Sequence, residues 1–158
     1  MPHRDSISTY LRQISIPEGV VIDFGCGGKP VTNYIDLGEK AQYFSYDKNP
    51  QSKAQVILDM ENENLPEGQP KADVGFCIEV LEHAKKPQYV LSTIWQNMKY
   101  QGVLYLTVPF LFPIHHEEDY WRWTDKGIKM LLEDSMFQVE EIIPTEGNQG
   151  WIVKAIRK

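Results

Sequence analysis

The feature that most restricts the fold is a series of short apolar runs, each closed by a polar or turn residue. The run VVIDFG is apolar at nearly every position rather than at every second one. That pattern is typical of strands buried on both faces, as in a parallel sheet covered by helices. Five such runs are predicted to form one central sheet: residues 20–25, 43–47, 54–60, 73–80 and 102–110.

Segments of helical periodicity accompany these runs. Asp5 or Ser6 is the expected N-terminal cap of the first helix, and Thr124 is the expected cap of the last. The middle helix starts with Pro87 in its first turn, a position that proline favours, and is predicted to stop near Gly102. The predicted helices are residues 5–14, 87–101 and 124–136.

The chain closes with two further strand patterns, residues 137–146 and 151–158, on either side of a Gly-Asn-Gln-Gly turn. They are expected to form an antiparallel hairpin. Strands alternating with helices predict an α/β fold with a doubly wound, mostly parallel sheet of seven strands. No internal repeat or long linker is present, and 158 residues fit one domain, 1–158, with one core.

Composition narrows the classes of function. The formal net charge is −6, which disfavours nucleic acid as a partner. No apolar run reaches the length of a membrane span and the first ten residues lack the apolar core of a signal peptide, so a cytoplasmic protein without membrane contact is expected. Cys26 and Cys77 lie far apart without nearby ligands, which predicts neither a disulfide nor a metal site. The oligomeric state stays open, and a homodimer is compatible with the sequence.

Residues 23–30, DFGCGGKP, follow the first predicted strand and supply glycines that permit close approach of a ligand to the backbone. A P-loop is excluded because Pro30 occupies the position of the required hydroxyl residue. The dinucleotide fingerprint fits only in part, since its last glycine is also replaced by Pro30, although Asp47 lies at a suitable distance for a ribose contact. An NAD-binding oxidoreductase therefore remains an alternative.

Four segments, VVIDFGCGG, YFSYD, VILDM and ADVGFCIEVLEHAKKPQYVL, together resemble the ordered motifs of class I S-adenosylmethionine-dependent methyltransferases. The resemblance covers most of the chain, and the predicted closing hairpin is similar to the antiparallel strands that distinguish this Rossmann-like methyltransferase fold. The segment TVPFLFPIHHEEDYWRWT is similar to a branch of small methyltransferases often associated with sugar or cell-surface biosynthesis.

The resemblance implies S-adenosyl-L-methionine as the cofactor. The glycine turn would border its methionine part, Asp47 would accept hydrogen bonds from both ribose hydroxyls, and Met60 would supply an apolar wall for adenine. Each assignment has a structural alternative, because a glycine turn can simply connect two elements and Met60 can simply fill the core. The residues expected at the cofactor are Asp23, Gly25, Gly27, Asp47, Lys48, Asp59, Met60 and Glu79.

The loop after the fifth strand is expected to receive the methyl acceptor. An acceptor hydroxyl must lose a proton, and His115, His116 and Asp119 are candidates for that task, with His83 as a further candidate or a structural residue. The expected substrate contacts are Tyr120, Trp121, Arg122 and Trp123. In the alternative interpretation the tryptophans fasten the following helix to the sheet, and Arg122 pairs with Glu117 or Glu118.

The sequence thus favours O-methylation of a small molecule or a sugar or glycan hydroxyl. Methylation of DNA bases or protein amides is disfavoured, because EVLEH stands where the Asn-Pro-Pro-aromatic element of amino-directed enzymes would be. The segments on either side of the second strand are short, which predicts a reduced scaffold. A donor-binding but inactive partner or regulatory module is the alternative from another class.

Overall fold

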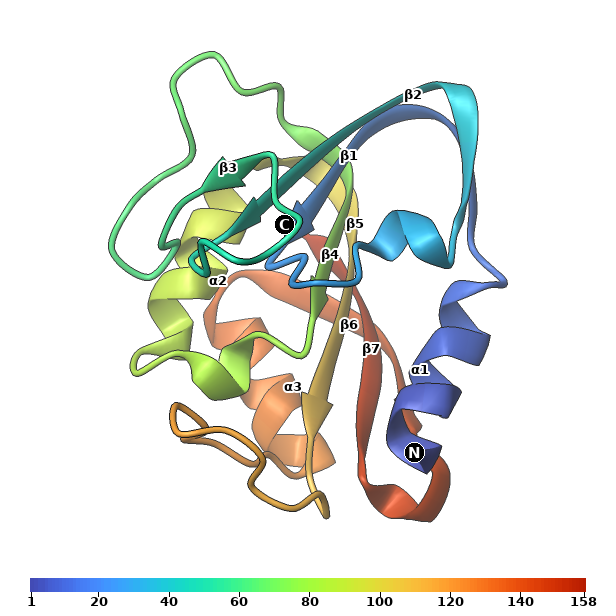
Figure 1. Ribbon diagram of the computed structural model, residues 1–158, viewed down its shortest axis with the longest axis vertical. Helices are drawn as coiled ribbons and strands as arrows, with labels where there is room; N and C mark the ends of the chain where they lie inside the picture. Colours follow the sequence, from blue (N-terminus) through green and yellow to red (C-terminus); the bar gives the residue numbers. More distant parts are fainter.

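A computed structural model describes residues 1–158 and contains one seven-stranded sheet (Figure 1). The strand order is β3-β2-β1-β4-β5-β7-β6. The first five strands are parallel, and β7 runs antiparallel to both β5 and β6, which confirms the predicted fold class and hairpin. The strands are β1 (Ser15–Phe24), β2 (Asp36–Asp47), β3 (Val56–Ile57), β4 (Ala72–Ile78), β5 (Met98–Pro109), β6 (Phe137–Pro144) and β7 (Gly150–Arg157).

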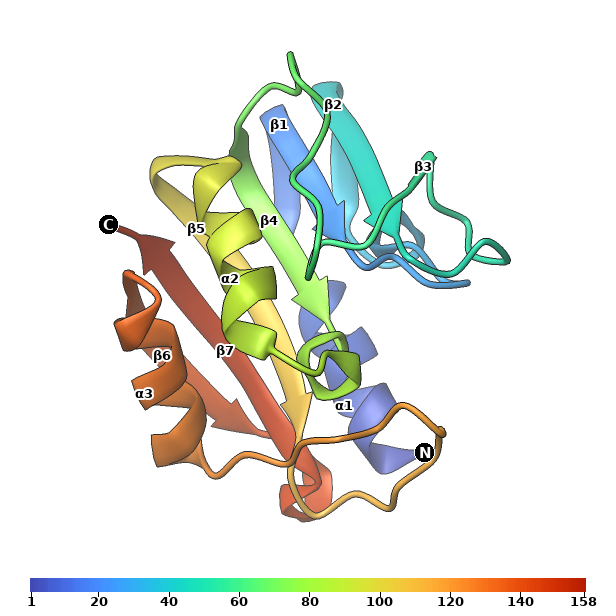
Figure 2. The same cartoon turned by 90° about the vertical axis from the view of Figure 1, so that its left-hand side faces the viewer.

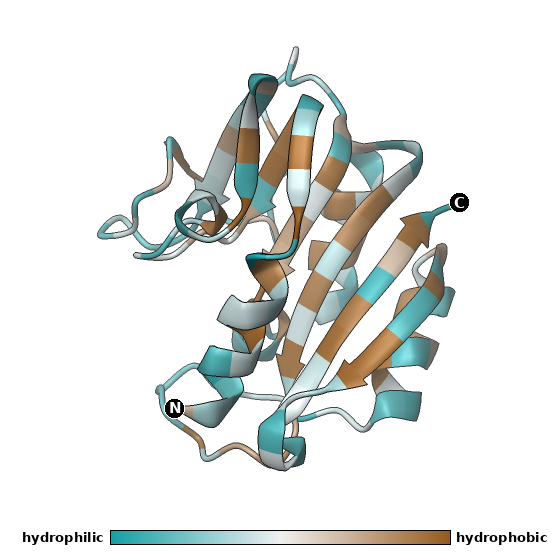
Figure 3. Cartoon of the chain, turned by 90° about the vertical axis from the view of Figure 1, so that its right-hand side faces the viewer, coloured by the Kyte–Doolittle hydropathy of each residue, from teal (hydrophilic) through white to brown (hydrophobic).

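Helices cover both faces of the sheet unequally. Helices α2 (Pro87–Gln96) and α3 (Asp125–Asp134) pack on one face, and α1 (Pro2–Leu11) packs alone on the other (Figures 2 and 3). The core beneath α2 and α3 contains 23 buried residues, whereas the core beneath α1 contains eight. Apolar burial is the main stabilising contribution in such a domain, so the α2–α3 side carries most of it. No helix is long and apolar enough to span a membrane.

The three helices were predicted in place but with different ends. Helix α1 occupies residues 2–11 rather than 5–14, with Pro2 in its first turn and Met1 as its cap. Helix α2 ends at Gln96 because the following residues pair with β4 as part of β5, with Met98 opposite Ala72. Thr124 caps α3 as predicted, accepting a hydrogen bond from the Gly127 amide at 3.0 Å.

Strand lengths also differ from the prediction: β1 and β5 begin earlier than expected, at Ser15 and Met98, and β2 and β3 differ for a shared reason. Strand β2 starts at Asp36 although residues 36–42 are largely polar, because they pair with the first half of β1, with one register shift between Ile16 and Glu18. In the third apolar run only Val56 and Ile57 form ladder pairs with β2, and the run then turns away into a loop. Pairing with a neighbouring strand, rather than local hydrophobicity, sets both boundaries.

The connections on one half of the sheet are short, as the sequence predicts. The β1–β2 connection contains only the 3₁₀ turn η1 (Val31–Asn33), and no helix separates β2 from β3 or β3 from β4. The strand order reverses beside β1, which lies between β2 and β4. In open α/β sheets a ligand site is expected at such a switch point, beyond the carboxyl ends of the strands.

Candidate active site

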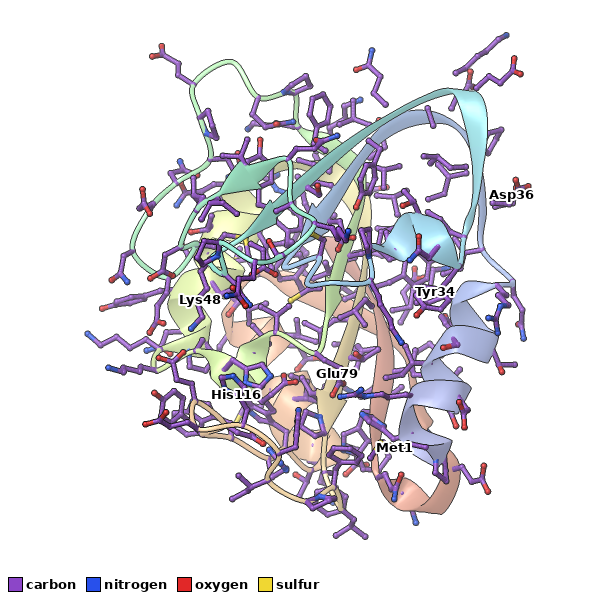
Figure 4. The ribbon with its side chains drawn as sticks, in the orientation of Figure 1. Met1, Tyr34, Asp36, Lys48, Glu79 and His116 are labelled. Carbon is purple, nitrogen blue, oxygen red and sulfur yellow. The ribbon has the colours of Figure 1, made fainter.

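A cavity of about 790 Å³ lies at the carboxyl ends of β1, β2 and β4. Its volume is in the range typical of small-molecule sites. Residues of α1 form one wall, and the loop between β5 and α3 forms another. In Figure 4, Lys48, Glu79 and His116 mark the strand and loop sides of this region, whereas Met1 and Tyr34 lie toward α1.

The glycine turn after β1 forms the floor of the cavity. Gly25 has φ +91° and a Cβ there would lie only 2.4 Å from Val80 Cγ2, so this position requires glycine. A Cβ on Gly27 or Gly28 would meet nothing within 4 Å. The amide of Gly25 donates to the Tyr46 carbonyl at 2.8 Å, which fastens the turn to β2. The turn therefore exposes backbone to the cavity from a fixed position.

Asp23 lies beneath this turn and is not part of the cavity surface. Its Oδ2 accepts hydrogen bonds from the Val31 amide and the Tyr43 hydroxyl, each at 2.8 Å. Burial raises the pKa of Asp23 to about 6, although both hydrogen bonds oppose this shift. In this structure Asp23 supports the glycine turn from below, and its predicted role at the cofactor stays a prediction.

Asp47 ends β2 and lines the cavity. Its Oδ2 accepts from the Gly27 amide and its Oδ1 from the Asn49 amide, both at 2.8 Å. A carboxylate has about four acceptor sites, so two remain for a ligand. The neighbouring Lys48 also lines the cavity and reaches Glu118 at 2.9 Å, which links β2 to the loop before α3.

Asp59 and Met60 follow β3 and both line the cavity. The Asp59 carboxylate is occupied by the Glu61 amide at 3.0 Å and the Asn62 side chain at 2.7 Å. Met60 is buried, and its carbonyl accepts a hydrogen bond from Thr93 of α2 at 2.8 Å. The two residues thus form a rigid corner with one charged and one apolar surface.

Glu79 follows β4 with φ +55°, a conformation that is uncommon outside glycine. Its amide donates to Thr107 Oγ1 at 3.0 Å, and that hydroxyl donates back to Glu79 Oε1 at 2.9 Å. The other oxygen, Oε2, lies 3.1 Å from Nε2 of the buried His3 in α1, without hydrogen-bond alignment. These contacts hold a strained backbone and place the Glu79 carboxylate at the cavity.

Three imidazoles, those of His83, His115 and His116, gather at one end of the cavity. The ring of His83 meets the other two edge to face, with centroid distances of 5.7 Å to His115 and 5.4 Å to His116. Residues more than 30 positions apart along the chain are thus brought together because the loop after β5 folds back over the end of β4. The sequence predicted these residues but not this mutual contact.

Hydrogen bonds distinguish the three rings. His115 Nδ1 donates to the Pro113 carbonyl at 3.4 Å and also lies 3.2 Å from Asp119 Oδ2, without hydrogen-bond alignment. Arg122 holds the same carboxylate at 2.9 Å. His116 Nδ1 instead accepts the Glu118 amide at 3.1 Å. A neutral ring that donates through Nδ1 has a free acceptor at Nε2, whereas one that accepts through Nδ1 carries its proton on Nε2. His115 therefore has the geometry of a base, and His116 that of a donor.

Asp119 is enclosed behind His115 rather than exposed in the cavity. The pKa of Asp119 is lowered to about 2, chiefly by its hydrogen bonds from Arg122. It therefore stays ionised and orients His115. His83 differs, because its Nδ1 contacts the Glu118 carbonyl and its Nε2 lies 3.6 Å from the buried Glu82. Both nitrogens of His83 thus face protein groups.

None of the four predicted substrate contacts, Tyr120, Trp121, Arg122 and Trp123, lines the cavity. Trp123 is buried in the core, and Trp121 donates to the Ala84 carbonyl at 2.8 Å. The structure thus agrees with the packing alternative for Trp123, whereas Trp121 is exposed and contacts the segment after β4 rather than the following helix. The alternative pairing of Arg122 with Glu117 or Glu118 is wrong, because Arg122 pairs with Asp119. Tyr120 is half-exposed outside the cavity.

Sequence reasoning missed the wall that α1 contributes. Arg4, Ser8 and Leu11 all line the cavity, and their spacing places them on one helix face. The sequence indicates only an amphipathic helix here, although two polar residues and one apolar residue on a single helix face could have indicated a cavity wall. Phe112 and Tyr34 were missed as well, and neither lies in a recognisable motif.

Comparison with known proteins identifies the family and the fold of the chain. Residues 4–140 match a protein family described as a methyltransferase domain. No curated protein matches at a significant level.

Solved structures with the same fold are numerous but distant in sequence. A putative methyltransferase of Haloferax volcanii, in complex with the Trm112 activator, has 15% identity and a TM-score of 0.76, covering 98% of this chain and 89% of that one. A methyltransferase of Aquifex aeolicus has 18% identity and a TM-score of 0.73, covering 95% and 88%. Magnesium protoporphyrin IX methyltransferase of Synechocystis PCC 6803, with bound S-adenosylhomocysteine, has 17% identity and a TM-score of 0.64, covering 98% and 81%. The chain therefore belongs to the methyltransferase domain family, with the fold of the class I S-adenosylmethionine-dependent methyltransferases.

Proposed function

We propose that the protein transfers the methyl group of S-adenosylmethionine to a hydroxyl of a small molecule or glycan. The observation that carries the oxygen-directed part is the His115–Asp119 contact at the cavity. A hydroxyl acceptor needs a base, and an imidazole held by an ionised carboxylate is suited to that role.

The cavity surface fits the methyl donor in its chemistry. The open space at Gly27 and Gly28 allows close approach of an amino-acid group to the backbone. Two acceptor sites of Asp47 remain for a ribose diol, and Met60 offers an adaptable apolar surface for a base. Seven of the eight residues predicted for the cofactor line this one cavity, and Asp23 supports its floor. S-adenosylmethionine would supply an electrophilic methyl group there.

The chain's own residues would orient and deprotonate the acceptor. His115 Nε2 would take the hydroxyl proton, and Asp119 would stabilise the imidazolium that results. His116 would donate a hydrogen bond through Nε2 to an acceptor oxygen. The link between Lys48 and Glu118 would help to close the cavity against water.

A donor-binding module without catalytic activity is the second candidate. The observation in its favour is that none of the four predicted substrate contacts reaches the cavity, which leaves few groups to hold an acceptor. Binding of the methyl donor is common to both candidates, so it does not separate them. Transfer to an acceptor does.

The experiment has two parts. Calorimetric titration with S-adenosylhomocysteine should show binding, with NAD as the negative control. Purified protein with methyl-labelled S-adenosylmethionine should then transfer label to members of a panel of phenols, alcohols and sugars. His115→Ala should slow this transfer by about 10²–10⁴ while still binding S-adenosylhomocysteine. Binding of NAD alone would refute the proposal, and donor binding without transfer to any hydroxyl compound would favour the inactive module.

A further inference from the structure

Glu82 is a fully buried carboxyl group that the proposed reaction does not use. It lies in the short 3₁₀ turn η2 (Leu81–His83) directly after β4, with 0% of its surface exposed. Neither of its carboxyl oxygens has a hydrogen-bond partner. Buried polar groups are normally paired, and an isolated buried charge is far more costly than a neutral acid. An unpaired carboxyl at this depth therefore needs an explanation.

The groups around Glu82 come from three elements. Cys77 and Glu79 face it from β4 and its end, and His83 faces it from the same turn with Nε2 3.6 Å from Oε1. Asp119 and Arg122 face it from the loop after β5. The one strong cation among them, Arg122, is already engaged by Asp119. The other basic group beside Glu82 is His83, whose Nε2 lies beyond hydrogen-bond distance of Oε1.

Glu79 connects Glu82 to the cavity. Its carboxylate lines the cavity, whereas Glu82 lies behind it and out of reach of a ligand. Burial raises the pKa of Glu82 well above its usual range, and the adjacent carboxylate of Glu79 raises it further. When two carboxyl groups lie side by side, ionisation of one opposes ionisation of the other. Burial thus favours the protonated form of Glu82, and the imidazole of His3 in α1 faces Glu79 from the other side, 3.1 Å from Oε2.

We propose that Glu79 and Glu82 form a proton-sharing pair that responds to the charge of the ligand in the cavity. A cation beside Glu79 compensates one carboxylate, so that Glu82 can release its proton. A ligand of the same shape without that cation leaves the proton in place. This inference rests on the proposed function, because S-adenosylmethionine carries a sulfonium and S-adenosylhomocysteine does not.

Thermodynamic linkage gives the inference a measurable form. If binding of a ligand releases a proton, the affinity for that ligand rises with pH by up to about tenfold per pH unit for each proton. The ratio of the affinity for S-adenosylmethionine to that for S-adenosylhomocysteine should therefore increase with pH. The same linkage favours replacement of the product, S-adenosylhomocysteine, which lacks the sulfonium charge, by a new molecule of S-adenosylmethionine.

Calorimetry in buffers of different ionisation enthalpy counts the protons released on binding. We expect S-adenosylmethionine to release more protons than S-adenosylhomocysteine in the wild-type protein. Glu82→Gln keeps the shape of the side chain but cannot ionise, and should abolish this difference. Glu117→Gln is the matched control, because Glu117 is exposed and does not line the cavity, and it should leave the difference unchanged.

A second measurement needs no variant and so does not depend on correct folding of Glu82→Gln. Infrared difference spectra of the wild-type protein should lose a protonated-carboxyl band on addition of S-adenosylmethionine but not of S-adenosylhomocysteine. Equal proton release by both ligands, or a difference that persists in Glu82→Gln, would overturn the inference while leaving the proposed function intact. Failure of both ligands to bind would overturn the two together.

Discussion

His115 and Asp119 are joined by a contact of 3.2 Å between Nδ1 and Oδ2, at the point where the loop after β5 meets the cavity. The backbone amide of His115 also reaches the same carboxylate at 3.2 Å, so that ring and backbone are both fixed by one acid. Arg122 completes the arrangement from the other side of Asp119. Two adjacent histidines thus differ in hydrogen bonding, and this difference leads to a prediction about each.

Replacing His115 with Ala should reduce turnover by about 10²–10⁴, the usual contribution of a general base. His116→Ala should reduce it by less than about tenfold, because its Nδ1 accepts a backbone amide and its Nε2 can only donate. Labelled methyl transfer under saturating S-adenosylmethionine measures both. The loss of turnover in Asp119→Asn should lie between the losses in the two histidine variants. Equal losses in the two histidine variants would contradict the assignment of the base.

Asp47→Asn should weaken binding of S-adenosylhomocysteine by about 10- to 100-fold, because hydrogen bonds to a charged acceptor contribute about 1.5–3 kcal/mol each. Asp36→Asn is the matched control at the opposite end of β2, away from the cavity (Figure 4). Calorimetric titration of the three proteins measures the effect. The melting temperature of each variant should be measured as well, because Asp47 also accepts a hydrogen bond from the Gly27 amide and its loss could change stability. Identical affinities in the variant and the wild type would remove Asp47 from the proposed ribose contact.

Gly25→Ala should destabilise the fold more than Gly68→Ala. Both glycines have a positive φ, +91° and +86°, so each substitution costs roughly 1–2 kcal/mol in backbone strain. Only at Gly25 does the new Cβ also collide, 2.4 Å from Val80 Cγ2. The difference in free energy of unfolding between the two variants, measured in urea, isolates this collision and should be about 1–3 kcal/mol. Equal destabilisation would show that Val80 can move aside.

Asp23 should make stability depend on pH in an unusual direction. Its pKa is raised to about 6 by burial, so between pH 4 and pH 6 the folded state binds more protons than the unfolded state. The contribution of Asp23 is therefore fully present below about pH 4 and is lost as pH rises through about 6, a change of roughly 3 kcal/mol.

Asp23→Asn removes this titration but keeps an oxygen for the Val31 amide and the Tyr43 hydroxyl. The free energy of unfolding of the wild type, relative to that of Asp23→Asn, should decline across pH 4 to 7. Urea titrations of both proteins at several pH values provide the measurement. A constant difference would show that Asp23 is ionised in the folded protein throughout.

The centre of the sheet could be predicted because β1, β4 and β5 contain near-continuous apolar runs, which are typical of strands buried on both faces. The residues that the family resemblance implied for the cofactor stand near the ends of strands, and parallel strands end at one edge, so seven of the eight line one cavity. Strand β2 shows the limit of this reasoning. Residues 36–42 are polar enough to suggest a loop, and only pairing with β1 makes them a strand.

The contacts that α1 makes at the cavity were harder to predict because its residues meet the strands only through tertiary contacts. His3, Glu79 and Thr145 are far apart along the chain, yet His3 lies 3.1 Å from Glu79 and 2.9 Å from Thr145. Trp123 shows the opposite error, since an aromatic residue in a loop suggested a ligand surface and is instead buried in the core. Local sequence does not state which side of such a loop faces the ligand.

The position of β7 between β5 and β6 has a consequence for the order of assembly. Strand β6 has no ladder with β5 and joins the sheet only through β7, which comes later along the chain. During synthesis, the sheet can therefore grow by successive addition of parallel strands up to β5. Strand β6 then has no strand to pair with until β7 has been synthesised. Emergence of β7 from the ribosome then admits both strands at once.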